Sequence, residues 1–334
     1  MHKKILIIKP GSYGDVIHSL PFLQALRDTY PDSELHWVIA GSLKGMLEGH
    51  PMIDRMWVIE KDTWKNPWKV AATINELRTL RTNLSAQKYT LVVDLQGLLR
   101  SGLIARLSGC NNVIGFKEAR EGSPLFYNHL VEGGKDVHAV DRYLKVAHAM
   151  GCEISKKVTF PLYFSKERPG VMDELPTEYA VTVPGARWIT KRWPASHFGR
   201  LSALLPVATV ILGSTGDIPA AEEIVSSSKG KAISLAGKTK LADIPWIISQ
   251  AKFVVSNDTG PMHTAAALNV WVYAIIGPTE PKRTGPYGTN STVIRQTLSC
   301  MPCFKKKCNT IQCLRDLSFH TVYEIIAERE SFRT

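Results

Sequence analysis

The loop at residues 9–15 is the first place where residue types and spacing point to chemistry. It reads KPGSYGD and lies between an apolar run and a stretch with helical spacing. Its two glycines let the backbone bend tightly and turn N–H groups toward a ligand, while Asp15 stands at the start of the helix. The G-x-G-x-x-G and phosphate-loop patterns are absent from the sequence. The loop is therefore either a ligand-binding loop or a plain turn in which Asp15 only caps the helix.

A second polar junction, SNDTGPMH at residues 256–263, follows an apolar run and opens another helical pattern. Thr259 and Gly260 place a hydroxyl and N–H groups at the positive end of that helix, which is a suitable phosphate site. His263 follows Thr259 by four positions, on the same helical face. The alternative is an Asx turn with helix capping.

The third candidate is PGARWITKRWP at residues 184–194. Its cations could hold a diphosphate, with Lys191 as a point charge and Arg187 or Arg192 as a fork. The alternative is a solvated surface loop, although two tryptophans in one exposed loop would be unusual.

Asp217 ends the segment LGSTGD at residues 212–217, again after an apolar run. By analogy with dinucleotide-binding folds, a carboxylate in this position accepts hydrogen bonds from ribose hydroxyls. The alternative is an acidic turn residue before a helix.

Four cysteines, Cys300, Cys303, Cys308 and Cys313, lie within fourteen residues near the C-terminus. Four thiols could bind zinc or a cluster, but these spacings fit none of the common patterns well, and we expect no metal. The lysine run at 305–307 would lower the thiol pKa values, or it could face an anionic partner.

Apolar runs and helical patterns alternate along both halves of the chain, which predicts parallel sheets with crossover helices. The predicted strands are 5–8, 35–39, 56–59, 90–93, 113–116, 179–183, 207–212, 232–235, 253–256 and 270–276. The predicted helices are 16–28, 70–84, 98–107, 140–150, 194–205, 219–228, 241–250 and 261–268.

Residues 151–178 lose this rhythm and are richer in proline and charge, as a linker would be. The simplest architecture is two doubly wound, Rossmann-like α/β domains facing each other across a cleft. In such sheets, ligands bind beyond the carboxyl ends of the strands, where the four candidate loops lie.

Length and composition exclude several classes of protein. A chain of 334 residues exceeds what one core usually organises, and with 44% hydrophobic residues and no biased tract it is globular. Its apolar runs are too short for a membrane span or a signal peptide, so we expect a cytoplasmic protein. The net charge of +11 predicts an anionic partner. Scattered basic residues without a nucleic-acid-binding motif favour sugar or nucleotide phosphates over nucleic acid.

Several segments taken together carry a family resemblance. They are GSYGDVIH at 11–18, KRWP at 191–194, DTGPMH at 258–263 and GPTEP at 277–281. In this order and spacing they resemble the ADP-heptose:lipopolysaccharide heptosyltransferases, glycosyltransferase family 9. The segment DLQGL at 94–98, with those at 119–121, 125–128 and 138–140, is similar to heptosyltransferase I, which acts on the first Kdo sugar of the inner core. The cysteine segment is more similar to heptosyltransferase II.

The resemblance implies a GT-B fold and an inverting transfer. Residues 1–165 would form the acceptor-binding domain with its linker, and residues 166–334 would bind the nucleotide sugar, with the last helix packing back on the first domain. No cofactor is implied beyond the donor substrate ADP-heptose. Because no two aspartates are separated by one residue, a metal-binding Asp-x-Asp motif is absent from the sequence.

The same resemblance assigns roles to individual residues. Asp15 would be the general base, and Lys191 with the backbone at Thr259 and Gly260 would stabilise the ADP leaving group. The residues implied in donor binding are Ser12, Gly14, Arg187, Lys191, Asp217, Thr239, Asp258, Thr259, Gly260 and His263. The candidates for the anionic acceptor are Lys61, Arg120 and Arg142.

The implied partners are an ADP-sugar and Kdo-lipid A at the inner membrane, so the enzyme would attach peripherally to its cytoplasmic face. Three alternatives remain from the sequence. The chain could be heptosyltransferase II or another family 9 transferase that extends a heptosylated acceptor. It could be a nucleotide-sugar-binding protein without activity, or a metal or redox protein built on the cysteines.

Overall fold

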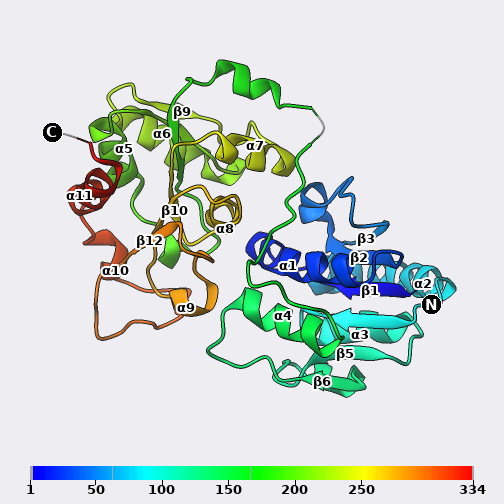
Figure 1. Ribbon diagram of the computed structural model, residues 1–334. Helices are drawn as coiled ribbons and strands as arrows, with labels where there is room; N and C mark the ends of the chain where they lie inside the picture. The colour runs from blue at the N-terminus through cyan, green and yellow to red at the C-terminus, as the bar shows by residue number, and fades with distance from the viewer. Residues whose placement is uncertain (1–2, 62, 166, 333–334) are drawn as a thin grey trace. The chain divides into compact units, whose positions relative to one another are not determined.

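The computed structural model describes residues 3–61, 63–165 and 167–332 (Figure 1). The chain divides into two compact units, Met1–Tyr163 and Phe164–Thr334, and this boundary falls inside the segment expected to be a linker. Each unit has its own six-stranded sheet. Of the helices in the described ranges, none combines the length and the apolar character that crossing a bilayer would take.

The first unit is a doubly wound α/β fold with the sheet order β3-β2-β1-β4-β5-β6, and all paired neighbours are parallel. Its strands are β1 (Lys4–Ile8), β2 (Glu34–Ala40), β3 (Arg55–Ile59), β4 (Leu91–Asp94), β5 (Val113–Phe116) and β6 (His129–Val131). Its helices are α1 (Tyr13–Thr29), α2 (Val70–Ala86), α3 (Leu99–Leu107) and α4 (Ala139–Ala149).

The central strand β1 contributes to the core on both faces of this sheet. Leu6 and Ile8 belong to one buried cluster with Leu84 of α2 and Ile104 of α3. Since side chains alternate along a strand, the equally buried Ile7 points to the opposite face. There α1 packs against α4, and α1 is buried along most of its length. The end of β1 is therefore fixed from both sides.

The second unit is also doubly wound and all parallel, with the sheet order β12-β11-β10-β7-β8-β9. Its strands are β7 (Tyr179–Val183), β8 (Ala208–Ile211), β9 (Ala232–Ser234), β10 (Val254–Asn257), β11 (Val272–Ile275) and β12 (Ser291–Ile294). Its helices are α5 (Ala195–Leu204), α6 (Ile218–Ser227), α7 (Ile244–Ser249), α8 (Gly260–Ala267), α9 (Pro281–Thr284), α10 (Gln312–Arg315) and α11 (Phe319–Glu330).

The last helix, α11, completes the core of the second unit. Val322 and Ile326, four residues apart, are fully buried in the cluster that contains Phe253 and Tyr273. This face of α11 therefore belongs to its own unit. The expected contact of the last helix with the first domain stays a prediction.

Both sheets repeat one strand order. In each unit the first strand lies beside the fourth, β1 beside β4 and β7 beside β10, and the chain runs outward from that pair in both directions. A reversal of this kind opens a crevice at the carboxyl ends of the two central strands. The loops that follow β1, β4, β7 and β10 are thus the places to look for a site.

All the predicted strands and helices are present, with small shifts at their ends. The prediction missed β6 and β12, which are edge strands in their sheets. Leu130 of β6 and Val293 of β12 are both exposed, so neither strand has the buried apolar run that identifies the central strands. It also gave no residue ranges for α9, α10 or α11, although a last helix was expected and α11 is that helix.

Candidate active site

In the first unit, Asp15 lies in a loop that its own carboxylate helps to shape. Oδ2 of Asp15 accepts hydrogen bonds from the Ser12 backbone N–H at 3.1 Å and from the Ser12 hydroxyl at 2.9 Å. The Asp15 N–H returns a bond to Ser12 Oγ, which makes a capping box at the start of α1. A side chain at Gly11 would place a Cβ atom 2.9 Å from Cβ of Asp15. Asp15 therefore does cap α1, and these bonds fix where its carboxylate points.

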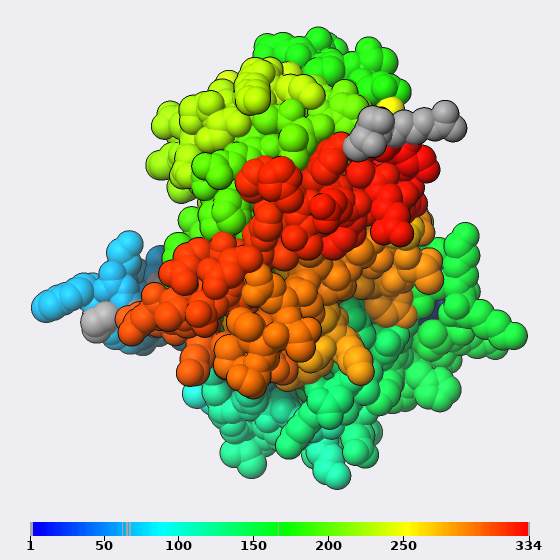
Figure 2. Space-filling view, turned by 90° about the vertical axis from the view of Figure 1, so that its left-hand side faces the viewer, coloured from blue at the N-terminus to red at the C-terminus, as the bar shows by residue number. Residues whose placement is uncertain are grey.

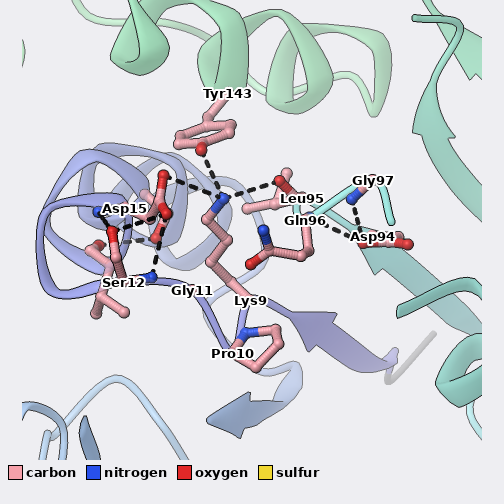
Figure 3. A network of polar contacts seen from close by, with 12 residues as sticks. Lys9, Pro10, Gly11, Ser12, Asp15, Asp94, Leu95, Gln96, Gly97 and Tyr143 are labelled. Atoms are coloured by element: carbon pink, nitrogen blue, oxygen red, sulfur yellow. Dashed lines mark hydrogen bonds and ion pairs between the residues drawn. The ribbon is translucent and has the colours of Figure 1, made fainter. Parts of the chain in front are cut away.

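A buried cation, Lys9, faces the other oxygen of Asp15 (Figure 3). Its Nζ atom lies 3.7 Å from Oδ1 of Asp15 and donates to the Leu95 carbonyl at 3.1 Å and to the Tyr143 hydroxyl at 2.6 Å. Burial lowers the pKa of Lys9, but the charge of Asp15, the contact with Tyr143 and the more distant Asp94 together raise it above its usual value. Lys9 is therefore an ammonium ion at neutral pH. No role is predicted for Lys9 from the sequence pattern.

The turn after β4 holds the carbonyl that Lys9 uses. Oδ1 of the buried Asp94 accepts the N–H groups of Gln96 at 2.8 Å and Gly97 at 3.0 Å, and Oδ2 accepts the Tyr127 hydroxyl at 2.6 Å. Burial raises the pKa of Asp94, although these bonds oppose the shift. Gly97 has a φ of +67°, a left-handed conformation that favours glycine. Asp94 therefore shapes the turn, and the turn presents Leu95 to Lys9.

Of the three predicted acceptor residues, only Lys61 has a hydrogen bond to the Asp15 loop among the described contacts. Its Nζ atom donates to the Gly11 carbonyl at 2.5 Å. Arg142 lies in α4 next to Tyr143. Its guanidinium carbon is 4.3 Å from the centre of the Phe116 ring, and one guanidinium nitrogen is 3.9 Å from a carboxylate oxygen of Glu118. Arg120 is exposed in the loop that follows β5.

In the second unit, the central pair of strands brings Lys191 and Asp258 together. Their charged atoms are 2.6 Å apart, with side-chain exposures of 17% for Lys191 and 6% for Asp258. The Thr279 hydroxyl also donates to Oδ2 of Asp258, and Lys191 Nζ lies 4.8 Å from the centre of the Trp188 ring. A cation, its carboxylate partner and an aromatic ring thus converge beyond β7 and β10.

Asn257, for which the sequence pattern predicts no role, connects these two loops. Its Oδ1 atom accepts a hydrogen bond from the backbone N–H of Trp193 at 3.1 Å, and its Nδ2 donates to the Pro184 carbonyl at 2.7 Å. Thr259, the residue after Asp258, is the N-cap of α8, so the N–H groups of Gly260 and the first turn of the helix follow directly after the Lys191–Asp258 pair. His263 is buried one turn into α8.

Asp217 also caps a helix and approaches the loop after β7. Oδ2 of Asp217 accepts hydrogen bonds from the Ser214 backbone N–H at 2.9 Å and from the Ser214 hydroxyl at 2.7 Å. A Cβ atom at Gly185 would fall 2.6 Å from the same oxygen. The guanidinium of Arg192 lies 3.7 Å from Oδ1 of Asp217. The predicted donor residues Arg187, exposed in this loop, and Thr239, half-buried after β9, lie outside these contacts.

The cysteines provide no obvious metal centre. All six are free thiols. Within the part of the chain that the structure describes, no group of three or more His, Cys, Asp or Glu side chains is arranged to hold a metal ion. The pKa of Cys308 is lowered mainly by N–H groups of Ile311 and Thr310, with a smaller contribution from Lys305. The lysine run is thus a minor cause of this shift.

Two doubly wound units, one with a carboxylate at its central strand pair and the other with a cation and a helix N-terminus there, have the architecture of GT-B glycosyltransferases. Residues 77–313 match the model of glycosyltransferase family 9 (heptosyltransferase). The chain belongs to this family and is a glycosyltransferase.

Known proteins support the same assignment along nearly the whole chain. Lipopolysaccharide heptosyltransferase 1 of Escherichia coli K12 is 32% identical over 301 residues, which cover 87% of this chain and 93% of that protein. Its counterpart in Pseudomonas aeruginosa is 30% identical over 324 residues, covering 91% and 87%. The structure of an E. coli heptosyltransferase with ADP-2-deoxy-2-fluoro heptose matches with a TM-score of 0.79 and 27% identity, covering 98% and 99%. The predicted family and fold class are confirmed.

Proposed function

We propose that this chain transfers heptose from ADP-heptose to a Kdo sugar of the lipopolysaccharide inner core, with inversion at the anomeric carbon. The two relatives compared above are both named heptosyltransferase 1, which favours the first Kdo over a heptosylated acceptor. The solved neighbour that holds an ADP-heptose analogue supports a nucleotide-sugar donor. The observation that carries the chemistry is the Asp15 carboxylate, held in a fixed orientation at the central strand pair of the first unit.

Asp15 is the proposed general base. Ser12 holds one carboxylate oxygen, and the Lys9 ammonium keeps negative charge on the group favourable. The side chain is 38% exposed, so an acceptor hydroxyl can reach it. Because a carboxylate is a weak base for an alcohol, the proton moves late, after the hydroxyl oxygen has largely bonded to the anomeric carbon. Orientation and leaving-group stabilisation then account for most of the rate enhancement.

The second unit supplies that stabilisation. Lys191 and the N–H groups at the start of α8 would bind the diphosphate and offset the charge that develops on ADP as the glycosidic bond breaks. Asp258 orients Lys191, whose ammonium has further N–H groups for phosphate oxygens. Asp217 would accept ribose hydroxyls, and Arg187, Thr239 and His263 remain proposed donor contacts. In this scheme the side chains and the helix end neutralise the diphosphate, and no cofactor is used.

The anionic acceptor would be bound by Lys61, Arg120 and Arg142, all carried on loops and helices at the carboxyl edge of the first sheet. Each cation near an acidic membrane adds roughly 1 kcal/mol of attraction. With a net charge of +11, we propose peripheral attachment to the cytoplasmic face of the inner membrane.

The deciding experiment is a product assay with ADP-heptose and two acceptors in parallel, Kdo-lipid A and a heptosylated core. We expect heptose on Kdo-lipid A, no extension of the heptosylated acceptor, and no product from the Asp15→Ala variant, which should still bind ADP. Extension of the heptosylated acceptor alone would assign type 2. ADP binding without turnover of either acceptor would support a non-catalytic binding protein.

A further inference from the structure

The cysteine loop, residues 295–311 between β12 and α10, is tied to the donor-binding edge of the second unit. The N–H groups of Cys303 and Phe304 both donate to the Pro278 carbonyl, at 3.0 and 2.9 Å. The Thr190 hydroxyl donates to the Lys305 carbonyl at 2.7 Å. Three consecutive residues of the loop are therefore attached to the segments that follow β11 and β7, so its backbone is fixed although its side chains are mostly exposed. In Figure 2 the orange and red C-terminal part of the chain, which includes the loop, faces the viewer.

These attachment points are next to the Lys191–Asp258 pair. Thr190 precedes Lys191, and Pro278 precedes Thr279, whose hydroxyl donates to Asp258. The cysteine loop thus contacts the segment that contains Lys191 and the segment whose Thr279 hydroxyl bonds to Asp258. A displacement of the loop would therefore also move the segments that carry Lys191 and Thr279.

The loop also brings a second cation to the aromatic ring that Lys191 uses. Nζ of Lys306 lies 5.3 Å from the centre of the Trp188 ring, and Nζ of Lys191 lies 4.8 Å from the same point. The separation of the two ammonium groups is therefore no larger than the sum of these distances. Lys191 is paired with Asp258, whereas Lys306 has no carboxylate within ion-pair distance among the described residues.

Two like charges on one ring repel each other, and an indole face offsets only part of that cost. An anion bound between them would turn the repulsion into attraction. A diphosphate presents several charged oxygens and can accept bonds from two separate ammonium groups. Two cations of this kind, one paired with a carboxylate and the other carried on a loop, can together hold a diphosphate.

We propose that Lys306 binds the diphosphate of the nucleotide sugar together with Lys191, so that the cysteine loop supplies a further cation to the donor site. This inference rests on the proposed function for the identity of the ligand. It gives the lysine run a specific role: Lys306 binds the donor, while its neighbour Lys307 is a solvated charge that serves as a matched control.

The test is the affinity of the full chain for ADP and for AMP, measured by titration calorimetry. Lys306→Ala should weaken ADP binding by about tenfold, the effect of one charge-assisted hydrogen bond, and AMP binding much less, because AMP lacks the second phosphate. Lys306→Arg should keep most of the ADP affinity. Lys307→Ala removes the same charge one residue away and should leave both affinities unchanged. Thermal melts of all variants establish that the fold is intact.

A double-mutant cycle tests whether Lys306 acts from a defined position on Trp188 or only through the positive charge that it adds to the surface. If Trp188 positions Lys306, the combined loss of ADP affinity in Trp188→Leu/Lys306→Ala will be smaller than the product of the separate losses. Equal weakening by Lys306→Ala and Lys307→Ala, or no weakening by Lys306→Ala, overturns the proposal while leaving the proposed function intact. Conversely, normal ADP binding with the expected Lys306 effect but no heptose transfer would overturn the function and support the contact.

Discussion

The Nζ atom of Lys9 lies 3.7 Å from Oδ1 of Asp15, with the lysine side chain 2% exposed and the aspartate side chain 38% exposed. A buried cation therefore lies next to a carboxylate that solvent can reach. The ammonium keeps its charge because the Leu95 carbonyl, Tyr143 and Asp15 together compensate for its burial. This relationship links the stability of the first unit to the charge of its proposed base.

Replacing Lys9 with Met tests that link. The Met side chain fills the space but leaves the Leu95 carbonyl and the Tyr143 hydroxyl without their donor, so we expect a loss of about 1–3 kcal/mol in the free energy of unfolding. The turnover number should also fall in the folded protein, since the Asp15 carboxylate loses its cation. Tyr143→Phe keeps the cation and serves as the control. Wild-type turnover in folded Lys9→Met would show that Lys9 acts on stability alone.

Changing Asp15 and Ser12 one at a time should separate an effect on turnover from an effect on stability. Asp15→Asn keeps an oxygen that can cap α1 but cannot take a proton, so we expect turnover to fall by about 10²–10⁴ with a change in unfolding free energy below about 1 kcal/mol. Ser12→Ala should cost about 1 kcal/mol of stability and reduce turnover far less. Denaturant titrations and initial rates measure both. The reverse pattern would assign Asp15 a capping role only.

The Lys191–Asp258 pair should behave as a nearly buried ion pair. Among the described contacts, Lys191→Met leaves Asp258 with the Thr279 hydroxyl as its side-chain partner, so we expect a loss of about 2–4 kcal/mol in unfolding free energy. Lys191→Met/Asp258→Asn removes both charges and should recover much of that stability. Donor binding should be weak in both variants, because the cation is absent from each. A stable single variant would mean that solvent screens the pair.

The pH dependence of stability should contain a contribution from Glu118. Burial raises the pKa of Glu118, but hydrogen bonds from the N–H groups of Gly134 and Gly133, together with Arg142, bring it below its usual value. The stabilising effect of Glu118 is therefore present above the pKa that its carboxyl has in the unfolded chain. It is lost as the pH falls through the lower pKa that the carboxyl has in the folded protein.

The matching variant is Glu118→Gln, which keeps the oxygen but loses the charge. We expect it to be less stable than wild type by about 1 kcal/mol at pH 7, with the gap closing as acid protonates the wild-type carboxylate. Urea titrations across this pH range measure the gap. Glu132→Gln, an exposed carboxylate in a nearby loop, is the control. A gap that stays constant with pH would mean that the charge of Glu118 contributes nothing.

Strand-end position predicted much of the candidate site. Asp258, Thr259 and Lys191 were identified because each follows an apolar run, and the parallel sheet brings those ends together. Asp15 was identified in the same way, although its position alone left its role open. Its assignment as the base depended on the family resemblance.

The missed features depend on contacts between residues far apart in the chain. Lys9 gains its role from Tyr143, 134 positions later, and Asn257 gains its role from Pro184, 73 positions earlier. No local pattern marks such partners. The strand order was also beyond the sequence, because alternating strands and helices fit many orders. The docking of the cysteine loop depends on two backbone carbonyls, Pro278 and Lys305, whose surroundings no spacing reveals.

The repeated strand order gives each half of the chain its own sheet and its own core. Recombining two related transferases at the junction after residue 163 would break none of the strand pairings in the described chain and would divide neither core. Under the proposed division of labour, such a hybrid would inherit its choice of sugar donor from one parent and its choice of acceptor from the other. New glycan linkages can then arise by exchanging halves, without redesigning either site.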